Sequence, residues 1–205
     1  MALIRLANEA DQERLYQVVV ETGQSGDDAT PHYKDPKMLG HIYTAPYVVL
    51  APELVFVAEV NGQVAGYVCG VADSRAFEAS LEEKWWPGLR ERYPAPDVSR
   101  KARWTADELR AEWIHNPAPT PDYVVDPFPA HMHMNLMPNA RGGGLGRRLF
   151  DTWLEVARDC GVGPVHIGAD PKNAGGIAFW RAMGFERLLQ PDVTFSEETC
   201  WMGRA

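Results

Sequence analysis

The segment best suited to chemistry is a run of glycines flanked by arginines, ARGGGLGRR at residues 140–148. A glycine inside a helix or strand costs roughly 0.5–1 kcal/mol relative to alanine, so such a run indicates a need for bare backbone. A helical pattern follows directly, and the first amides of a helix have no partner within it and attract anions. The segment therefore predicts a site for a phosphate or pyrophosphate, with extra positive charge from Arg141 and Arg147.

Three kinds of phosphate-binding loop compete for this segment. A P-loop ends in Gly-Lys-Ser/Thr, whereas this run ends in Gly146-Arg147-Arg148. The dinucleotide fingerprint G-x-G-x-x-G would place its last glycine where Arg147 stands. The pattern Arg-x-x-Gly-x-Gly fits without adjustment, on Arg141, Gly144 and Gly146.

Titratable side chains on two predicted strands form the second group suited to chemistry. Side chains alternate between the two faces of a strand, so every second residue shares a face. On the strand predicted over 130–137, the residues of one face are His131, His133 and Asn135. On the strand predicted over 163–170, they are His166, Gly168 and Asp170.

Two of these residues, His133 and Asp170, are our candidates for the base of a proton-transfer reaction. A histidine near its ordinary pKa is a suitable base at neutral pH. The competing interpretation of each histidine is a partly buried side chain that is fully hydrogen-bonded. For Asp170, it is a carboxylate that caps the turn over residues 171–173.

The elements that must position these groups follow the order of a mixed α/β chain. Asn61-Gly62, between two β-rich runs, favours a type I′ hairpin because both residues tolerate positive φ. Asn8 is a good N-cap for a helix that ends near Gly23, and Gly184 is a good C′ residue for the last helix. Further strands are expected over 2–7, 130–137, 163–170, 185–189 and 199–202, and helices over 9–22, 37–43, 145–159 and 173–184.

The sequence pattern changes over residues 74–128, which contain helical segments, prolines and four tryptophans. We predict that they form an insertion within a single domain of residues 1–205. Helices are expected over 74–94 and 105–116, the second opened by a capping box of Thr105 and Glu108. A compact domain needs no connection this long, so we expect the insertion to be a lid or the acceptor-binding region. Its tryptophans either serve that role or pack the insertion onto the core; they are Trp85, Trp86, Trp104 and Trp113.

The composition narrows the class of protein. The chain has 205 residues, 45% of them hydrophobic, which is enough for one good-sized core. A formal net charge of −8 argues against a nucleic-acid partner. The three cysteines have no metal or redox spacing, and there is no export signal and no apolar run of membrane length. We therefore expect a cytoplasmic protein without a metal site or a membrane partner.

Several segments, in the expected order, resemble the GCN5-related N-acetyltransferase (GNAT) superfamily. NLMPNARGGGLGRRL at 135–149 is similar to its acetyl-CoA pyrophosphate loop. NAGGIAFWRAMGF at 173–185 is similar to its second coenzyme A motif, an asparagine followed by a helix that ends in Gly-Phe. The first strand and helix and the Asn61-Gly62 hairpin match the first half of the family, and the insertion is left out. More narrowly, AHMHMNLMPNARGGGLG at 130–146 resembles bacterial relatives of the acetyltransferase-like domain of O-GlcNAcase.

The resemblance implies an α/β fold with a mixed, mostly antiparallel sheet that splays open beside the glycine loop and binds acetyl-CoA in the opening. The pyrophosphate would lie on the amides of residues 142–147, and the pantetheine arm would pair with the backbone of residues 134–136. Asn173 would bind the pantetheine or phosphate region. The implied cofactor-binding residues are Met134, Asn135, Leu136, Arg141, Gly142, Gly143, Gly144, Leu145, Gly146, Arg147, Asn173, Phe179 and Trp180.

Two positions depart from the acid and base that the family often uses. Trp180 stands where a tyrosine often protonates the leaving thiolate, and an indole N–H donates a hydrogen bond but delivers no proton near neutral pH. Gly168 stands where a glutamate often acts as the base. Tyr123, in the insertion, is a candidate replacement for the acid.

Three hypotheses of function follow from these observations. The first is an N-acetyltransferase that transfers acetyl from acetyl-CoA directly to a small amine or a lysine-type acceptor. The second, suggested by Trp180 and Gly168, is a catalytically silent relative that binds acetyl-CoA. The third is an interaction module whose tryptophan-rich insertion recognises a protein, and a homodimer is compatible with each. The acids and rings of residues 78–86 are compatible with a cationic acceptor, or equally with a solvated helix face.

Overall fold

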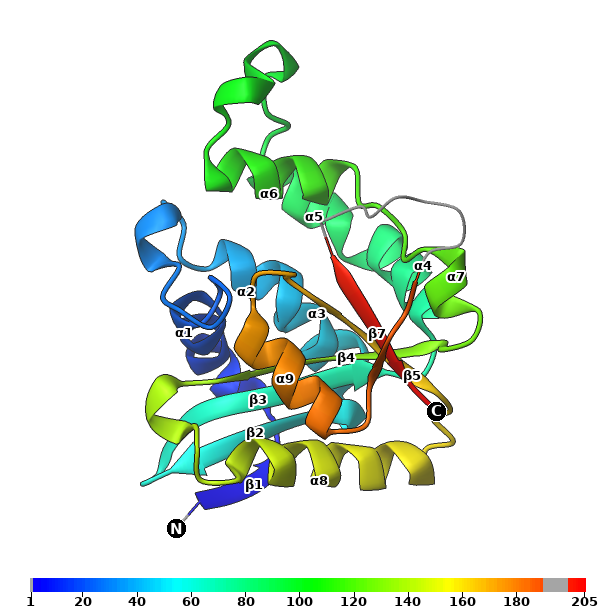
Figure 1. The fold of residues 1–205 in the computed structure, drawn as a ribbon. Helices are drawn as coiled ribbons and strands as arrows, with labels where there is room; N and C mark the ends of the chain where they lie inside the picture. Colours follow the sequence, from blue (N-terminus) through cyan, green and yellow to red (C-terminus); the bar gives the residue numbers. More distant parts are fainter. Residues whose placement is uncertain (1, 190–198) are drawn as a thin grey trace.

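A mixed sheet forms the centre of the computed structural model, which describes residues 2–189 and 199–205 (Figure 1). Its strands are β1 (Ala2–Leu6), β2 (Val55–Val60), β3 (Gln63–Val71), β4 (Ala130–Leu136), β5 (Val165–Ala169), β6 (Glu186–Arg187) and β7 (Cys200–Arg204). They lie in the order β1-β2-β3-β4-β5-β7-β6. Every neighbouring pair is antiparallel except β4 and β5, which are parallel. This is the mostly antiparallel sheet that the resemblance predicted.

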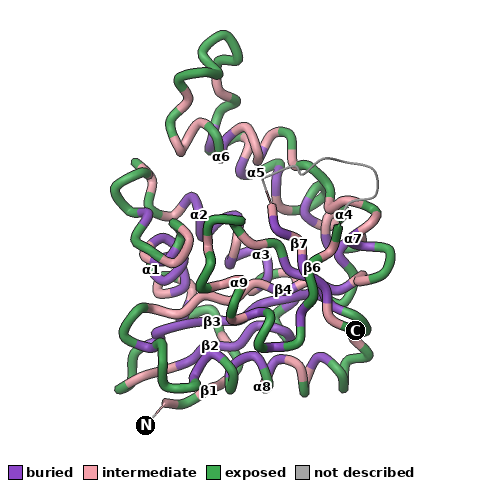
Figure 2. Tube along the Cα trace, in the orientation of Figure 1, coloured by how far each residue is buried: buried purple, intermediate pink, exposed green. Residues whose placement is uncertain are grey.

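Helices cover both faces of the sheet, each over its own buried cluster (Figures 1 and 2). On one face lie α1 (Gln12–Glu21), α2 (Met38–Tyr43) and α3 (Ala45–Leu50), which share a cluster with β2, β3 and the inserted helices. On the other lie α8 (Leu145–Asp159), which packs mainly on β2 and β3, and α9 (Ala174–Ala182); both contribute to a cluster that also contains residues of β4, β5 and β7. In the part of the chain that is described, no helix is long and apolar enough to cross a membrane.

The structure confirms the predicted hairpin turn, the predicted N-cap and the predicted capping box. Asn61 has φ 53° and Gly62 has φ 77°, as a type I′ hairpin turn requires. The side chain of Asn8 accepts a hydrogen bond from the Ala10 amide and opens the first helical segment. Thr105 and Glu108 form the predicted capping box at the start of α6 (Ala106–His115).

The segment predicted as an insertion leaves and rejoins the sheet at one point. The Ser74 amide donates to the Pro129 carbonyl at 2.8 Å, so its two ends lie side by side. The single helix expected over 74–94 is wrong. The segment divides into α4 (Ser74–Lys84) and α5 (Trp86–Arg92), because Pro87 lacks the amide that would continue the helical ladder. Two short helices, α3 and α7 (Asp122–Val125), were not predicted.

Three of the four tryptophans pack the insertion onto the body of the protein. Trp86 is 2% exposed in the cluster shared with α1 and α2, and Trp113 stacks on Tyr43 of α2 with ring centroids 6.3 Å apart. The indole N–H of Trp85 donates to the His41 carbonyl at 2.8 Å. Trp104 instead follows the turn at Val98–Arg103, which projects from the body of the protein (Figure 1). The Lys101 ammonium lies over its ring.

The sheet opens between its two parallel strands. Residues 130–131 of β4 pair with residues 165–166 of β5, and the pairing of these two strands ends there. On its other side, β4 stays paired with β3 up to Leu136, which lies opposite Gly66. From Met132 to Leu136 the edge of β4 that faces β5 is therefore unpaired, and this opening positions the site described below.

Candidate active site

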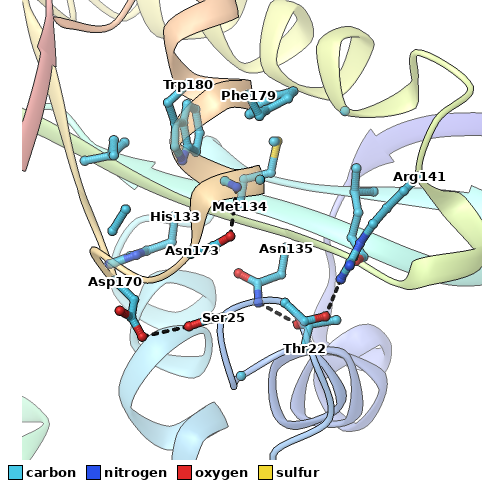
Figure 3. A pocket seen from close by; sticks show the side chains of 18 of the residues that line it. Thr22, Ser25, His133, Met134, Asn135, Arg141, Asp170, Asn173, Phe179 and Trp180 are labelled. Atoms are coloured by element: carbon cyan, nitrogen blue, oxygen red, sulfur yellow. Dashed lines mark hydrogen bonds between the residues drawn. The ribbon is translucent and has the colours of Figure 1, made fainter. Parts of the chain in front are cut away.

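A cavity of about 1040 Å³ occupies the opening between β4 and β5 (Figure 3). The glycine loop and the start of α9 line one half of it, and α1, α2 and α6 line the other. It brings together most of the residues that were predicted from the sequence: His133, Met134, Asn135, Leu136, Arg141, Gly142, Gly144, Gly146, Arg147, Asp170, Asn173, Phe179 and Trp180. Gly143 and Leu145 are not among the lining residues, and Leu145 packs into the core beneath the loop.

The glycine loop presents bare backbone to this cavity. Gly142 and Gly144 have φ 81° and 75°, a conformation that side chains rarely adopt. A β-carbon on either would meet nothing within 4 Å, so open space lies over the loop. Gly146 is required by packing instead, because a β-carbon there would approach the Leu136 side chain to 3.0 Å. The first amides of α8, which have no helical partner, therefore start at an open, glycine-lined surface.

Two arginines place positive charge beside these amides. Arg141 donates to the Leu136 carbonyl at 2.9 Å and to the Gly26 carbonyl at 2.7 Å, which joins the end of β4 to the loop after α1. Arg147 donates to the Ala182 carbonyl at 3.2 Å. Within residues 2–189 and 199–205, neither guanidinium forms an ion pair with a carboxylate. Their charge is thus available to a bound anion.

Asn173 caps helix α9 at the edge of the cavity. Its Oδ1 accepts a hydrogen bond from the Gly176 amide at 2.8 Å. The close approach needs a glycine at 176, where a β-carbon would come within 2.6 Å of the Asn173 Nδ2. One end of the side-chain amide therefore serves the helix, and the other lines the cavity.

The position often held by a catalytic tyrosine is part of an aromatic wall. Trp180 is 8% exposed and packs edge-to-face against Phe179 and Phe185, with ring centroids 5.1 and 5.0 Å away. Phe150 of α8 completes the cluster at 6.1 Å. Trp180 consequently shapes the cavity but brings no titratable proton to it.

The position often held by a catalytic glutamate is glycine for a packing reason. Gly168 of β5 pairs with Trp201 of β7. A β-carbon at 168 would lie 3.1 Å from the indole ring of Trp201 and 3.0 Å from the Thr199 methyl group. The ring of Trp201 therefore fills the space that a larger side chain would need.

Asp170 holds a turn. Its Oδ1 accepts from the Lys172 amide at 2.8 Å, and its Oδ2 accepts from the Ser25 hydroxyl at 2.7 Å (Figure 3). The hydrogen bond from Ser25, followed by that from the Lys172 amide, lowers the pKa of this carboxyl. The turn-capping interpretation is therefore present in the structure, and a carboxylate with a lowered pKa is a weaker base.

His131 belongs to a closed chain of hydrogen bonds. Ser74 Oγ lies 2.7 Å from both the Pro129 carbonyl and the His131 Nδ1, and the Tyr47 hydroxyl lies 2.7 Å from His131 Nε2. Because the carbonyl can only accept, Ser74 donates to it and accepts from Nδ1–H, which leaves Nε2 to accept from Tyr47. Burial holds the pKa of His131 well below its usual value. His131 is thus a neutral, fully hydrogen-bonded residue.

His133 is the histidine that faces the cavity. Its ring contacts those of Tyr43, Tyr47 and His131 at 5.9, 5.6 and 5.7 Å. Burial, with a smaller effect of His166, lowers the pKa of His133 to about 4. Its imidazole is therefore neutral at pH 7. His166, by contrast, is 2% exposed and donates from Nδ1 to the Phe128 carbonyl at 2.6 Å.

Sequence reasoning missed the side chains that build the half of the cavity opposite the glycine loop. They are Thr22, Ser25, Tyr43, Tyr67 and Arg110. Thr22 accepts from Asn135 Nδ2 at 2.6 Å, and Tyr67 lies opposite Asn135 in the β3–β4 register. They come from four separate parts of the chain: the turn after α1, α2, β3 and α6. The one available signal was strand alternation, which places Tyr67 on a buried face without indicating a cavity.

The structure does not support two suggestions from the sequence, which are an acidic site for a cationic acceptor and a catalytic role for Tyr123. The acids of residues 78–86 do not line the cavity; Glu78 pairs with Arg75, and Glu82 pairs with Arg90. A cationic acceptor therefore finds no support in them. Tyr123 also lies outside the lining of the cavity, so nothing places it as a replacement acid.

Comparison with known proteins agrees with the fold. Residues 13–185 match the acetyltransferase (GNAT) family. The chain therefore belongs to the GNAT family of acetyltransferases, and the superfamily that its sequence resembles is confirmed.

Solved structures similar to this chain span nearly its whole length. SsHAT is 34% identical, with a TM-score of 0.86 over 99% of this chain and 97% of that one. The putative acetyltransferase yncA from Salmonella typhimurium, solved with its cofactor acetyl-CoA, is 17% identical, with a TM-score of 0.54 over 98% and 92%. The polyamine N-acetyltransferase of Drosophila melanogaster, which forms N-acetylagmatine, is 16% identical, with a TM-score of 0.56 over 99% of both chains. The last two share the fold alone.

Proposed function

We propose that this protein is an acetyl-CoA-dependent N-acetyltransferase that moves the acetyl group directly from the thioester to an amine. The observation that carries the proposal is the opening of β4 from β5 beside the start of α8. An unpaired strand edge and a set of free helix amides thus line one cavity. Membership of the GNAT family supports it, as does the acetyl-CoA held by the similar yncA structure.

In this proposal the cofactor lies along the half of the cavity lined by the glycine loop. The pyrophosphate accepts hydrogen bonds from the amides of residues 142–147, including those of Gly143 and Leu145, while Arg141 and Arg147 balance its charge. The pantetheine arm pairs with the unpaired edge of β4 at residues 134–136. Phe179 and Trp180 form its apolar wall, and the Asn173 Nδ2 is a donor for its polar groups.

The reaction needs an amine lone pair, a stabilised oxyanion and a leaving thiolate. The amine nitrogen attacks the thioester carbon; the new C–N bond forms, and the C–S bond then breaks to release coenzyme A as the thiolate. A backbone amide on the unpaired edge of β4 stabilises the oxyanion. The amine loses one proton, which either protonates the thiolate of coenzyme A or is released to the solvent.

Of the two candidate bases, His133 is the better placed. It is neutral at pH 7 and can accept a hydrogen bond from the incoming amine, although its low pKa limits it as a proton acceptor. Asp170 remains the second candidate, with both oxygens already engaged by Ser25 and Lys172. Most of the rate is then expected from positioning of the amine against the thioester.

The test is an assay of acetyl transfer. The purified protein is incubated with acetyl-CoA and a panel of amines, and free thiol and acetylated product are measured together. We expect turnover with at least one amine, and none in a Gly144→Val variant. Tight binding of acetyl-CoA without thiol release on the whole panel would overturn the proposal and favour an acetyl-CoA-binding relative instead.

We propose further that the closer relationship is to bacterial relatives of the acetyltransferase-like domain of O-GlcNAcase, on the strength of residues 130–146. A cytoplasmic location stays a prediction, with which the unpaired state of Cys69, Cys160 and Cys200 agrees. A homodimer also stays a prediction, and sedimentation of the purified protein tests it.

A further inference from the structure

One arginine of the insertion reaches into the cavity beside His133. Arg110 of α6 lines the cavity, and its guanidinium carbon lies 5.6 Å from the centre of the Tyr43 ring. The Tyr43 ring in turn lies 5.9 Å from that of His133. Arg110 also donates to the Tyr33 hydroxyl through Nε, at a long 3.3 Å. Its contacts thus place it in the half of the cavity opposite the glycine loop.

The charge of Arg110 has no counter-ion in the part of the chain that the structure describes. Within residues 2–189 and 199–205, no carboxylate lies within ion-pair distance of this half-buried side chain. The other insertion arginines outside the projecting turn are all paired. Arg75 meets Glu78 at 2.8 Å, Arg90 meets Glu82 at 2.8 Å, and Arg92 meets Asp35 at 3.1 Å.

The acids on the helix of Arg110 already have other partners. On its own helix, Asp107 accepts from the backbone amides of residues 34 and 35, and Glu108 caps the helix. Glu112 accepts from Asn116. Of the acids that line the cavity, Asp27 and Asp170, neither pairs with it. Among the described residues no acid pairs with the guanidinium, so its charge is open to a ligand.

A carboxylate is the ligand that this geometry suits. A guanidinium offers parallel N–H donors whose spacing matches the two oxygens of a carboxylate. A charge that has lost part of its hydration gains most from a partner with the opposite sign. The single long bond to Tyr33 engages Nε, which leaves the terminal nitrogens for such a pair.

We propose that Arg110 determines acceptor specificity, and that the acceptor is a small amine that also carries a carboxylate. The carboxylate pairs with Arg110 while the amine lies beside His133 and faces the thioester. This inference rests on the proposed function, because it names the substrate class of the same site. A short peptide with an acidic side chain presents the same chemistry and forms a separate arm of the test.

The test measures binding, so it does not depend on turnover. Pairs of amines that differ in the carboxylate, 4-aminobutyrate against butylamine and 6-aminohexanoate against hexylamine, are titrated by calorimetry with and without saturating coenzyme A. We expect the wild type to bind the carboxylate member of at least one pair about tenfold more tightly or better. Arg110→Gln should lose that difference, and Arg110→Lys should keep part of it because it keeps the charge.

Two controls make the result specific. Arg103→Gln removes the same charge from the exposed turn of the insertion and should keep the full preference of the wild type. A Gly-Asp dipeptide, with its amine and side-chain carboxylate, tests the peptide source; tighter binding than the small acids would overturn the small-molecule assignment. Circular dichroism of each variant checks that it is folded.

The outcomes separate this inference from the proposed function. No carboxylate preference in the wild type, or an unchanged preference in Arg110→Gln, would overturn the role of Arg110 while leaving acetyl-CoA binding intact. Failure of the wild type to bind coenzyme A would overturn the proposed function instead. The preference measured without coenzyme A would still decide the role of Arg110.

Discussion

The two halves of the cavity are built in different ways. The half lined by the glycine loop comes largely from one continuous part of the chain, residues 132–183, and offers mainly backbone: an unpaired strand edge and the amides at the start of α8. The opposite half is assembled from α1, α2, β3 and α6, joined by His133 of β4, and it offers side chains such as Tyr43, His133 and Arg110. The first half suits a ligand that is recognised by hydrogen bonds to backbone groups. The second half suits a ligand that is recognised by side chains, and so by its own charge and functional groups.

Because of this difference, the two halves should respond differently to amino-acid substitution. A site made of backbone amides is sensitive to conformation and steric access, so glycine substitutions should break it. A site made of side chains is sensitive to charge and hydrogen bonding, so isosteric changes should retune it while the fold persists.

The largest effect is expected at the glycine loop. Gly144→Val should weaken acetyl-CoA binding by roughly a thousandfold, because it blocks two or more charge-assisted hydrogen bonds, each worth about 1.5–3 kcal/mol. Calorimetric titration measures it. Gly161→Val is the matched control, since Gly161 has the same φ of 75° and the same open surroundings at the far end of α8. Equal affinity in the two variants would contradict the assignment of the loop.

The next largest effect is expected at His133, in the half of the cavity opposite the glycine loop, and it is a dependence of the free energy of unfolding on pH. Folding lowers the pKa of His133 to about 4 from an ordinary 6.5, so protons bind the unfolded chain more readily. Its contribution is complete above pH 6.5 and is lost as pH falls from 6.5 to 4. It amounts to roughly 3 kcal/mol. Urea unfolding at pH 7 and pH 4 should show a fall in stability smaller by about that amount in His133→Gln than in the wild type.

The smallest effect is expected at Asp170. Its two oxygens hold the turn and the Ser25 hydroxyl, so Asp170→Asn, which keeps an acceptor oxygen, should change kcat by less than about threefold. A general base would instead contribute roughly a hundredfold to ten-thousandfold. Steady-state kinetics with the amine found by the transfer assay decides. A loss of a hundredfold or more would restore Asp170 as the base and remove His133 from that role.

Much of the backbone frame could be predicted from short stretches of sequence. Asn61-Gly62 specified its turn because few residue pairs tolerate positive φ twice in succession. Thr105 and Glu108 specified the start of α6 because they satisfy each other's backbone amides. The failure at Pro87 was also local, since the break it causes lies within a segment that otherwise favours helix.

The roles of the side chains in the cavity could not be predicted in the same way. Gly168 is glycine because of Trp201, a residue from β7, and His131 is neutral because of Tyr47 and Ser74. The Ser25 hydroxyl reaches Asp170 across a separation of 145 residues. Each of these facts depends on which distant groups the fold brings within hydrogen-bond reach.

The sequence by itself determined that this chain exposes helix amides behind a glycine loop, because φ preferences and unpaired terminal amides act over a few consecutive residues. Only the tertiary structure decided which histidine faces the cavity, and that Arg110 of the insertion lines it without an ion pair to any carboxylate of the described residues. Burial and charge pairing are properties of the whole packed neighbourhood, and residues such as Tyr43, Arg110 and His133 become neighbours only when the insertion folds back over the sheet.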